Sequence, residues 1–334
     1  IRAKKDTVVN AFTAYLPQSK VNEPVDALPI IHKTLDTSRY YRLSVKGRYL
    51  SVDETGLTLS DDAEGTSTIF YYDENLSLLS YRNSRYIEDE GFTVAGNLPV
   101  MSLFEIAASG VDKYNLCVDG KYLGVDDNAV LCSYSDVDEP VNAENVEWSV
   151  EEVECLPVSI TTVGYATIYA GVALEVPDGI TAHTVVVDGD YAILSDPLDI
   201  IPAGCGVLLV AEEELDGTKV YDFIVTTTDE TVEDNALRGT LASTFVETEE
   251  GEQYYVLSNP DGVLAFYKAE LNDGKLYNNG HRAYLPHNTA HNNAPSAIKF
   301  NWSTGIDDVK DEERGDALIY DLHGRRIDNH VKGV

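Results

Sequence analysis

The chain has 334 residues, of which 43% are hydrophobic, and this length is enough for two domains of about 100–200 residues each. Lys and Arg total 24 against 57 Asp and Glu, so the net charge is -33 and the long-range field repels phosphate backbones and anionic lipid headgroups. The longest apolar runs, such as residues 205–211, are far shorter than the roughly 20 residues of a membrane helix. Composition therefore predicts neither a nucleic-acid partner nor membrane insertion.

The first 37 residues are expected to form a short helix followed by a connector. Val8, Val9, Phe12 and Leu16 follow one another at the spacing of a single helical face, and Pro17 ends the pattern. Two further prolines and no sustained period follow, which is typical of a connecting segment.

A short pattern then occurs three times, as GRYLSVD at 47–53, SRYIEDE at 84–90 and GKYLGVD at 120–126. Each copy is preceded by one alternating run and followed by two more, so each unit offers four short strands. Such a unit cannot bury its own apolar face alone, and three of them must close on one shared core. We expect Leu50, Ile87 and Leu123 to point into this core, and Ser51, Glu88 and Gly124 to point outward.

This threefold arrangement resembles the β-trefoil, over about residues 38 to 153, and we assign residues 38–156 to such a domain. The Gln-x-Trp motif of the sugar-binding ricin-like trefoils is absent from the corresponding segments. The resemblance therefore implies the fold and a binding role, without implying galactose recognition of the ricin type.

Five residues of the three copies are candidate ligand contacts. Tyr49, Tyr86 and Tyr122 either pack against the neighbouring unit or form aromatic platforms for a sugar ring. Asp53 and Asp126 either bind backbone N–H groups of their own turns or accept protons from sugar hydroxyls.

Residues 157–304 are expected to form an antiparallel β-sandwich. Seven alternating or apolar runs occur there, and Asp-Gly pairs at 188–189, 216–217 and 261–262 indicate hairpins or loops between them. The whole chain is thus predicted to be all-β, with a β-trefoil followed by a β-sandwich and a short N-terminal helix.

A second resemblance concerns the C-terminal half. The runs at 160–183, 200–212 and 262–286 are similar to a module found near the end of secreted or surface-exposed proteins of the Bacteroidetes. The tail, residues 305–334, resembles their sorting segment through Tyr320, Asp321, Leu322, Gly324, Arg325 and Arg326. This resemblance implies export and an extracellular or cell-surface location.

The sequence carries no recognisable catalytic motif: there is no Gly-x-Ser-x-Gly, and no cysteine lies in a protease-like context. His281, His287 and His291 lie close in sequence, but Asn, Thr, Ala and Pro around them indicate a loop rather than a zinc helix. Acidic loops leave structural calcium open, without the spacing of an EF-hand. We expect no metal site and no cofactor.

These observations predict a non-catalytic exported protein that binds carbohydrate or another surface polymer through the trefoil, with the sandwich as a spacer. Two alternatives stay open: an ancillary region of a larger secreted glycosidase or protease encoded upstream, and a structural or protease-inhibitory surface protein.

Overall fold

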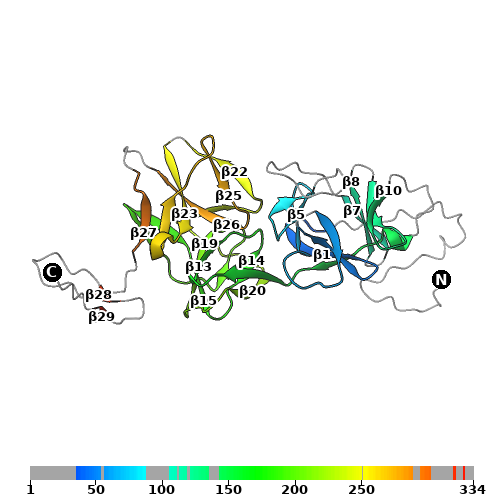
Figure 1. Cartoon of the computed structure of the whole chain (residues 1–334), viewed down its shortest axis with the longest axis horizontal. Helices are drawn as coiled ribbons and strands as arrows, with labels where there is room; N and C mark the ends of the chain where they lie inside the picture. Colours follow the sequence, from blue (N-terminus) through cyan, green and yellow to red (C-terminus); the bar gives the residue numbers. More distant parts are fainter. Residues whose placement is uncertain are drawn as a thin grey trace, which may run out of the picture.

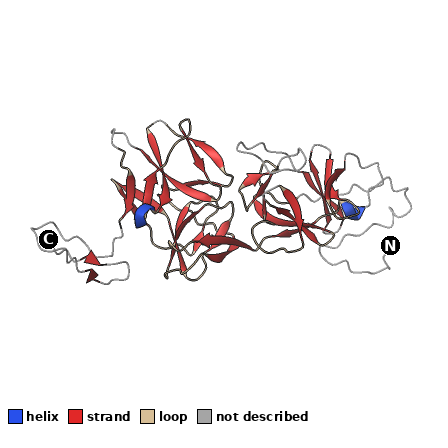
Figure 2. Cartoon of the chain, in the orientation of Figure 1, coloured by secondary structure: helices blue, strands red, loops and turns tan. Residues whose placement is uncertain are grey.

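A computed structural model describes residues 35–53, 56–87, 105–110, 113–118, 121–134, 143–249, 251–288, 294–301, 319–320 and 326–327. Within these residues the protein is all-β, and the helical segments there are two 3-10 turns, Ala143–Asn145 and Pro260–Gly262 (Figure 2). The predicted all-β class is thereby confirmed, whereas the helix expected at residues 4–16 lies outside the described residues. The strands form two lobes side by side, here called the first lobe (residues 35–152) and the second lobe (residues 153–301) (Figure 1).

The first lobe consists of two antiparallel sheets, one of the order β3-β2-β1-β4-β5-β6 with β11 pairing β1, and one of the order β10-β9-β8-β7. Strand β1 pairs with β4 on one side and with β11 on the other, β4 pairs with β5, and β7 pairs with β8. A bridge between Tyr114 of β8 and Trp148 links β8 to the segment before β11. Its strands are β1 (Arg39–Val45), β2 (Arg48–Val52), β3 (Leu57–Ser60), β4 (Phe70–Tyr72), β5 (Leu78–Ser80), β6 (Arg85–Tyr86), β7 (Glu105–Gly110), β8 (Lys113–Val118), β9 (Lys121–Val125), β10 (Leu131–Tyr134) and β11 (Ser149–Glu152).

The apolar members of the three sequence copies meet in one core, as predicted. Leu50, Ile87 and Leu123 are each no more than 1% exposed and belong to the same hydrophobic cluster. Trp148 closes this core, and its indole Nε1 donates to the carbonyl of Leu123 at 2.8 Å. The outward position expected for Ser51 and Gly124 is wrong, because both are buried and the Asn145 backbone lies against Gly124. Glu88, for which the same was expected, lies outside the described residues.

The second lobe contains three main sheets and a separate pair. The sheets have the orders β12-β20-β14-β18, β13-β19-β15 and β16-β17-β27-β24-β23-β26-β21, and β22 pairs with β25. Its strands are β12 (Cys155–Ile160), β13 (Tyr165–Ile168), β14 (Ala173–Glu175), β15 (Ile180–His183), β16 (Val185–Asp188), β17 (Tyr191–Leu194), β18 (Ile200–Ile201), β19 (Val207–Ala211), β20 (Lys219–Thr226), β21 (Arg238–Thr240), β22 (Thr244–Glu247), β23 (Glu252–Ser258), β24 (Ala265–Lys268), β25 (Lys275–Asn278), β26 (Arg282–Asn288) and β27 (Ala297–Phe300).

Strand β19 lies between two hydrophobic cores, so its sheet forms a middle layer between the other two main sheets. Its residues Val207 and Leu209 belong to one core and Leu208 between them belongs to another, and all three are fully buried. A strand buried on both faces is apolar throughout rather than alternating, which is the pattern of residues 205–211. Each of the seven predicted runs contains a strand, but the sheets stack in three layers rather than two.

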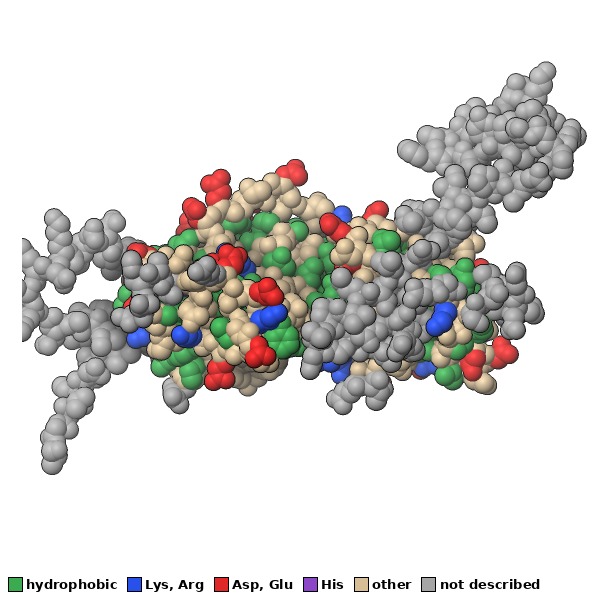
Figure 3. Space-filling model, turned by 90° about the horizontal axis from the view of Figure 1, so that it is seen from above, with side chains coloured by type: hydrophobic (Ala, Val, Ile, Leu, Met, Phe, Trp, Pro, Cys, Tyr) green, Lys and Arg blue, Asp and Glu red, His purple; other side chains and the backbone are tan. Residues whose placement is uncertain are grey.

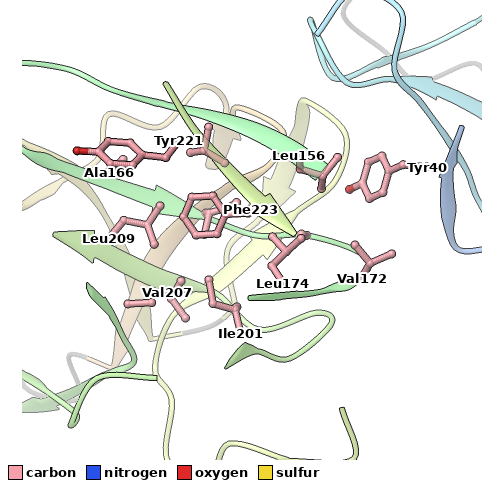
Figure 4. Packing of buried hydrophobic residues seen from close by; sticks show 14 of the residues in the cluster. Tyr40, Leu156, Ala166, Val172, Leu174, Ile201, Val207, Leu209, Tyr221 and Phe223 are labelled. Atoms are coloured by element: carbon pink, nitrogen blue, oxygen red, sulfur yellow. The ribbon is translucent and has the colours of Figure 1, made fainter. Parts of the chain in front are cut away.

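The two lobes share a hydrophobic core. Tyr40 and Tyr71 of the first lobe belong to the same cluster as Leu156, Leu174 and Phe223 of the second. Figure 4 shows the Tyr40 ring reaching from its strand toward Leu156 and Val172. Burial of apolar area from both lobes in one cluster opposes their separation in water.

Within the predicted tail, the structure describes one short antiparallel pair. Strands β28 (Ile319–Tyr320) and β29 (Arg326–Ile327) pair through Ile319 with Ile327 and Tyr320 with Arg326 (Figure 1). The sorting role implied by the resemblance stays a prediction.

Candidate ligand-binding site

The three sequence copies differ in the loop that precedes their tyrosine strand. In the first copy the loop is Lys46–Gly47, with φ of 49° and 77°, as a two-residue hairpin turn that matches the strand twist requires. In the third copy two residues also separate the paired positions Val118 and Lys121. In the second copy the loop between β5 and β6 is longer by two residues and comprises Tyr81–Ser84. Of the two loops among these that the structure describes, Lys46–Gly47 and Tyr81–Ser84, the second is the one directed at the second lobe.

The Tyr81–Ser84 loop is bonded to the second lobe at two points. The Tyr81 hydroxyl donates to the carbonyl of Pro157 at 3.1 Å, and the Ser243 N–H donates to the carbonyl of Ser84 at 2.7 Å. Burial raises the pKa of Tyr81 to about 12, so the hydroxyl keeps its proton and remains a donor. Gly280 lies against Ser84 and the Leu241 carbonyl so closely that a Cβ there would overlap both.

Between this loop and the turn Asn279–Arg282 of the second lobe lies a cleft of about 440 Å³. We call it the interlobe cleft. Its volume is in the range of about 300–1,000 Å³ that is usual for small-molecule sites. The described residues that line it are Thr66, Tyr81, Arg82, Asn83, Ser84, Pro157, Val158, Ser159, Ile168, Ser243, Asn279, Gly280, His281 and Arg282.

His281 is the most buried titratable group of the cleft, at 8% exposure, and its φ is 57°. Its Nδ1 lies 3.3 Å from the carbonyl oxygen of Tyr169 and 3.5 Å from the Tyr40 hydroxyl, and its ring centroid is 4.7 Å from that of Tyr81. Burial lowers the pKa of His281 to about 4, so the imidazole is neutral near pH 7. Its Nε2 is buried and has no hydrogen-bond partner among the described residues.

Arg282 and Arg82 bring the positive charge of the cleft. Arg282 donates from Nη1 to the carbonyl of Thr167 at 2.9 Å, and burial lowers the pKa of its guanidinium. Arg82 is exposed and donates from Nη1 to the carbonyl of Val52 at 3.4 Å. Both guanidinium groups retain further N–H donors beyond these bonds.

A second hollow of about 490 Å³ adjoins the interlobe cleft and shares Ser159, Asn279 and Arg282 with it. It lies within the second lobe, and we call it the side groove. Tyr165 and Tyr277 bring aromatic rings to it, and Tyr277 is 37% exposed. The remaining described lining residues are Thr161, Ala166, Thr167, Val256, Leu257, Ala269, Glu270, Leu276, Asn278 and Ala283.

The aspartates predicted from the three copies are turn residues. Asp126 Oδ1 accepts from the N–H groups of Asn128 and Val130 at 2.8 and 2.9 Å, and Asp53 Oδ1 accepts from Gly56 N–H at 3.1 Å. The bond from Val130 is the main reason why the pKa of Asp126 is lowered. Asp73, which the sequence analysis did not single out, makes the same kind of turn, through bonds from Asn75 and Ser77.

The predicted tyrosines do not share one environment. Tyr49 and Tyr122 are half-buried on β2 and β9, whose hairpins are linked by a bond from Arg48 Nη1 to the carbonyl of Ala129 at 3.2 Å. Tyr86 instead packs against the shared interlobe core, and its hydroxyl donates to Asp73 Oδ2 at 3.2 Å. The first and third hairpins are thus neighbours, whereas the tyrosine of the second copy contacts the core that the two lobes share.

The loop expected around the three histidines is wrong for residues 282–288, which form strand β26 and include His287. His281 precedes this strand, and His291 lies outside the described residues. Sequence reasoning also missed the interlobe cleft. The available signal was the separation between the inward Leu and the Tyr, which is longer from Leu78 to Tyr86 than from Leu43 to Tyr49.

Comparisons with known proteins assign neither a family nor a function to this chain. No family model and no curated protein matches the sequence. Among solved structures, the crystal structure of Cry35Ab1 is similar at 13% identity and a TM-score of 0.27, covering 77% of this chain and 90% of that one. In the part of the chain that the structure describes, no helix has the length and apolar character needed to cross a membrane.

Proposed function

We propose that the protein is a non-catalytic binding protein that holds an oligosaccharide, or a segment of a similar hydroxyl-rich surface polymer, in the interlobe cleft and side groove. The observation that carries this proposal is that the two hollows are adjacent and share the lining residues Ser159, Asn279 and Arg282. Two adjacent hollows suit an extended chain of sugar units better than a compact metabolite.

The lining residues have the chemistry that sugar recognition needs. Tyr165 and Tyr277 line the side groove, where their rings would give the C–H side of a sugar an apolar surface beside a polar tip. The Tyr81 ring packs against His281 and closes the inner side of the cleft. Side-chain amides and hydroxyls around these rings donate and accept hydrogen bonds, which fix the orientation of a polar ligand.

Binding of the full chain to an immobilised panel of plant, bacterial and host glycans tests the proposal. We expect at least one glycan to bind, and Tyr277→Ala to weaken that binding about fivefold to tenfold because a stacking contact of about 1–1.4 kcal/mol is lost. Tyr191→Ala is the matched control, since Tyr191 is 50% exposed on β17 and lines neither hollow. A correctly folded protein that binds no glycan would remove the proposal.

The same panel distinguishes two rivals. Loss of binding in Tyr49→Ala or Tyr122→Ala, with Tyr277→Ala unchanged, would move the ligand to the hairpins predicted from sequence. Release of shortened products from a bound glycan would contradict a non-catalytic role and favour a hydrolase.

We also propose an extracellular or cell-surface setting, supported by the resemblance of the tail to a sorting segment. Protease treatment of intact cells, with immunodetection of the chain, checks this. Protection of the chain in intact cells but not in lysed cells would contradict it.

A further inference from the structure

We propose that the interlobe cleft recognises the carboxylate of an acidic sugar, with Arg82 and Arg282 binding the acid group and His281 accepting a hydrogen bond from a sugar hydroxyl. The inference rests on the proposed function and narrows its ligand from saccharides in general to hexuronates. Of the two adjacent hollows, it identifies the interlobe cleft as the one that selects a ligand by its charge.

The charged side chains that line the cleft are positive, whereas the net charge of the protein is negative. The chain has 57 acidic residues against 24 basic ones, yet the described lining of the cleft holds two arginines and a histidine and no Asp or Glu. Carboxylates elsewhere are dispersed over the visible face rather than kept to one end (Figure 3). Two cationic side chains in a cleft lined by no carboxylate attract anions locally, against the repulsion from the net negative charge.

Neither arginine of the cleft has an ion-pair partner among the described residues, whereas Arg39, Arg48 and Arg238 pair with carboxylates. Arg42 and Arg85 are likewise without an ion pair there, so it is the place of Arg82 and Arg282 in one cleft that distinguishes them. Arg282 is half-buried, and removing a cation from water without a counter-charge is unfavourable. Its planar fork of N–H donors matches a carboxylate in a bidentate pair. A ligand carboxylate would supply the missing counter-charge.

His281 requires a hydrogen-bond donor from the ligand, whereas the arginines require an acceptor. A carbonyl oxygen only accepts hydrogen bonds, so the contact between Nδ1 and the Tyr169 carbonyl places the ring proton on Nδ1. Nε2 is then a buried acceptor without a donor among the described residues, which is an unfavourable state unless a ligand donates to it. A hexuronate has both groups, a carboxylate for the arginines and hydroxyl donors for the imidazole.

Calorimetric titration of the full chain with a hexuronate tetrasaccharide and with its carboxyl-reduced neutral counterpart tests the inference. We expect the hexuronate to bind about tenfold or more tightly than the neutral sugar, because a charge-assisted pair contributes more than a neutral one. Arg282→Gln and Arg82→Gln should each reduce this preference. Arg238→Gln, which alters a paired arginine that lines neither hollow, should leave it unchanged.

The outcomes separate the inference from the proposed function. Equal binding of the two tetrasaccharides overturns the carboxylate site while the saccharide-binding proposal stands, and binding of neither, together with an empty glycan panel, removes both. If Arg282→Gln does not fold, the exposed Arg82 still decides, because an unchanged preference in Arg82→Gln contradicts its role. A preference for a sulfated neutral tetrasaccharide over the hexuronate would contradict the choice of carboxylate.

Discussion

At the scale of single residues, Gly280 determines how closely the two lobes approach. An added Cβ would overlap Ser84 of the first lobe and the Leu241 carbonyl of the second. We therefore expect Gly280→Ala to lower the free energy of unfolding by about 1–3 kcal/mol, as overpacking usually does. Denaturant unfolding measures this change.

The matched control is Gly217→Ala, where an added Cβ meets no atom within 4 Å. We expect that variant to stay within about 0.5 kcal/mol of the parent. Equal stability of the two variants would contradict the tight contact at Gly280.

His281 should make stability depend on pH. Its pKa is about 4 in the folded protein and about 6.5 in an unfolded chain, so the unfolded state binds the proton first as pH falls. The contribution is complete above about pH 6.5 and is lost as pH falls toward 4. Between pH 7 and pH 5 the loss from this group is about 2 kcal/mol.

The test compares the parent with His281→Asn, because asparagine tolerates the positive φ at this position. The difference in unfolding free energy between pH 7 and pH 5 should be smaller in the variant by about this amount. An identical pH dependence in both proteins would mean that His281 does not stay neutral and buried.

At the scale of elements, the Tyr81–Ser84 loop distinguishes the second copy of the repeat, because it contacts the second lobe and lines the interlobe cleft. The loop provides four consecutive lining residues of the cleft, whereas the two-residue turn Lys46–Gly47 of the first copy provides none. Replacing Tyr81–Ser84 by the Asp-Gly pair of the third copy should leave the first lobe folded, because that turn suits the same hairpin. Glycan binding should be lost.

Circular dichroism and binding to the glycan panel measure these two outcomes separately. Replacement of Lys46–Gly47 by Asp-Gly is the control, since this turn lies in open space and should alter neither property. Retained binding with the shortened second loop would show that the cleft is not the ligand site.

Local sequence patterns predicted the strands but not the site, for a physical reason. Alternation and turn residues act over a few positions, so the copies at Tyr49, Tyr86 and Tyr122 and the apolar runs of the second lobe were recognisable from sequence. The strand at 282–288 was missed because His287, Pro286 and the nearby asparagines have turn-like propensities that tertiary pairing with β23 overrides.

The cleft could not be derived in the same way. Tyr81 and His281 are 200 positions apart in the sequence, yet their ring centroids are 4.7 Å apart. No local period links such residues, and only the docking of the two lobes brings them together. The one feature of the site that the sequence alone contains is the longer separation between Leu78 and Tyr86, and it was not recognised as a signal.

At the scale of the whole molecule, the shared core makes the lobes one thermodynamic unit. Tyr40 and Tyr71 are buried among side chains of the second lobe, so unfolding of either lobe would expose apolar area of both. Units that share a core in this way unfold cooperatively. The sandwich is then a wall of the site rather than the spacer expected from sequence, if the interlobe cleft is the ligand site.

This coupling predicts that a destabilising substitution in one lobe also lowers the free energy of unfolding of the other. Leu43 is fully buried in the core of the first lobe alone, and Leu43→Ala should cost about 2–5 kcal/mol through the lost methyl groups and the cavity they leave. In a coupled molecule, hydrogen exchange of β19 and β20 in the second lobe should accelerate together with that of β1 and β4. Leu285→Ala, made in the separate core of the second lobe, should produce the reciprocal effect. Acceleration confined to the mutated lobe in both variants would mean that the lobes unfold independently, and the cleft between them would then open without unfolding either one.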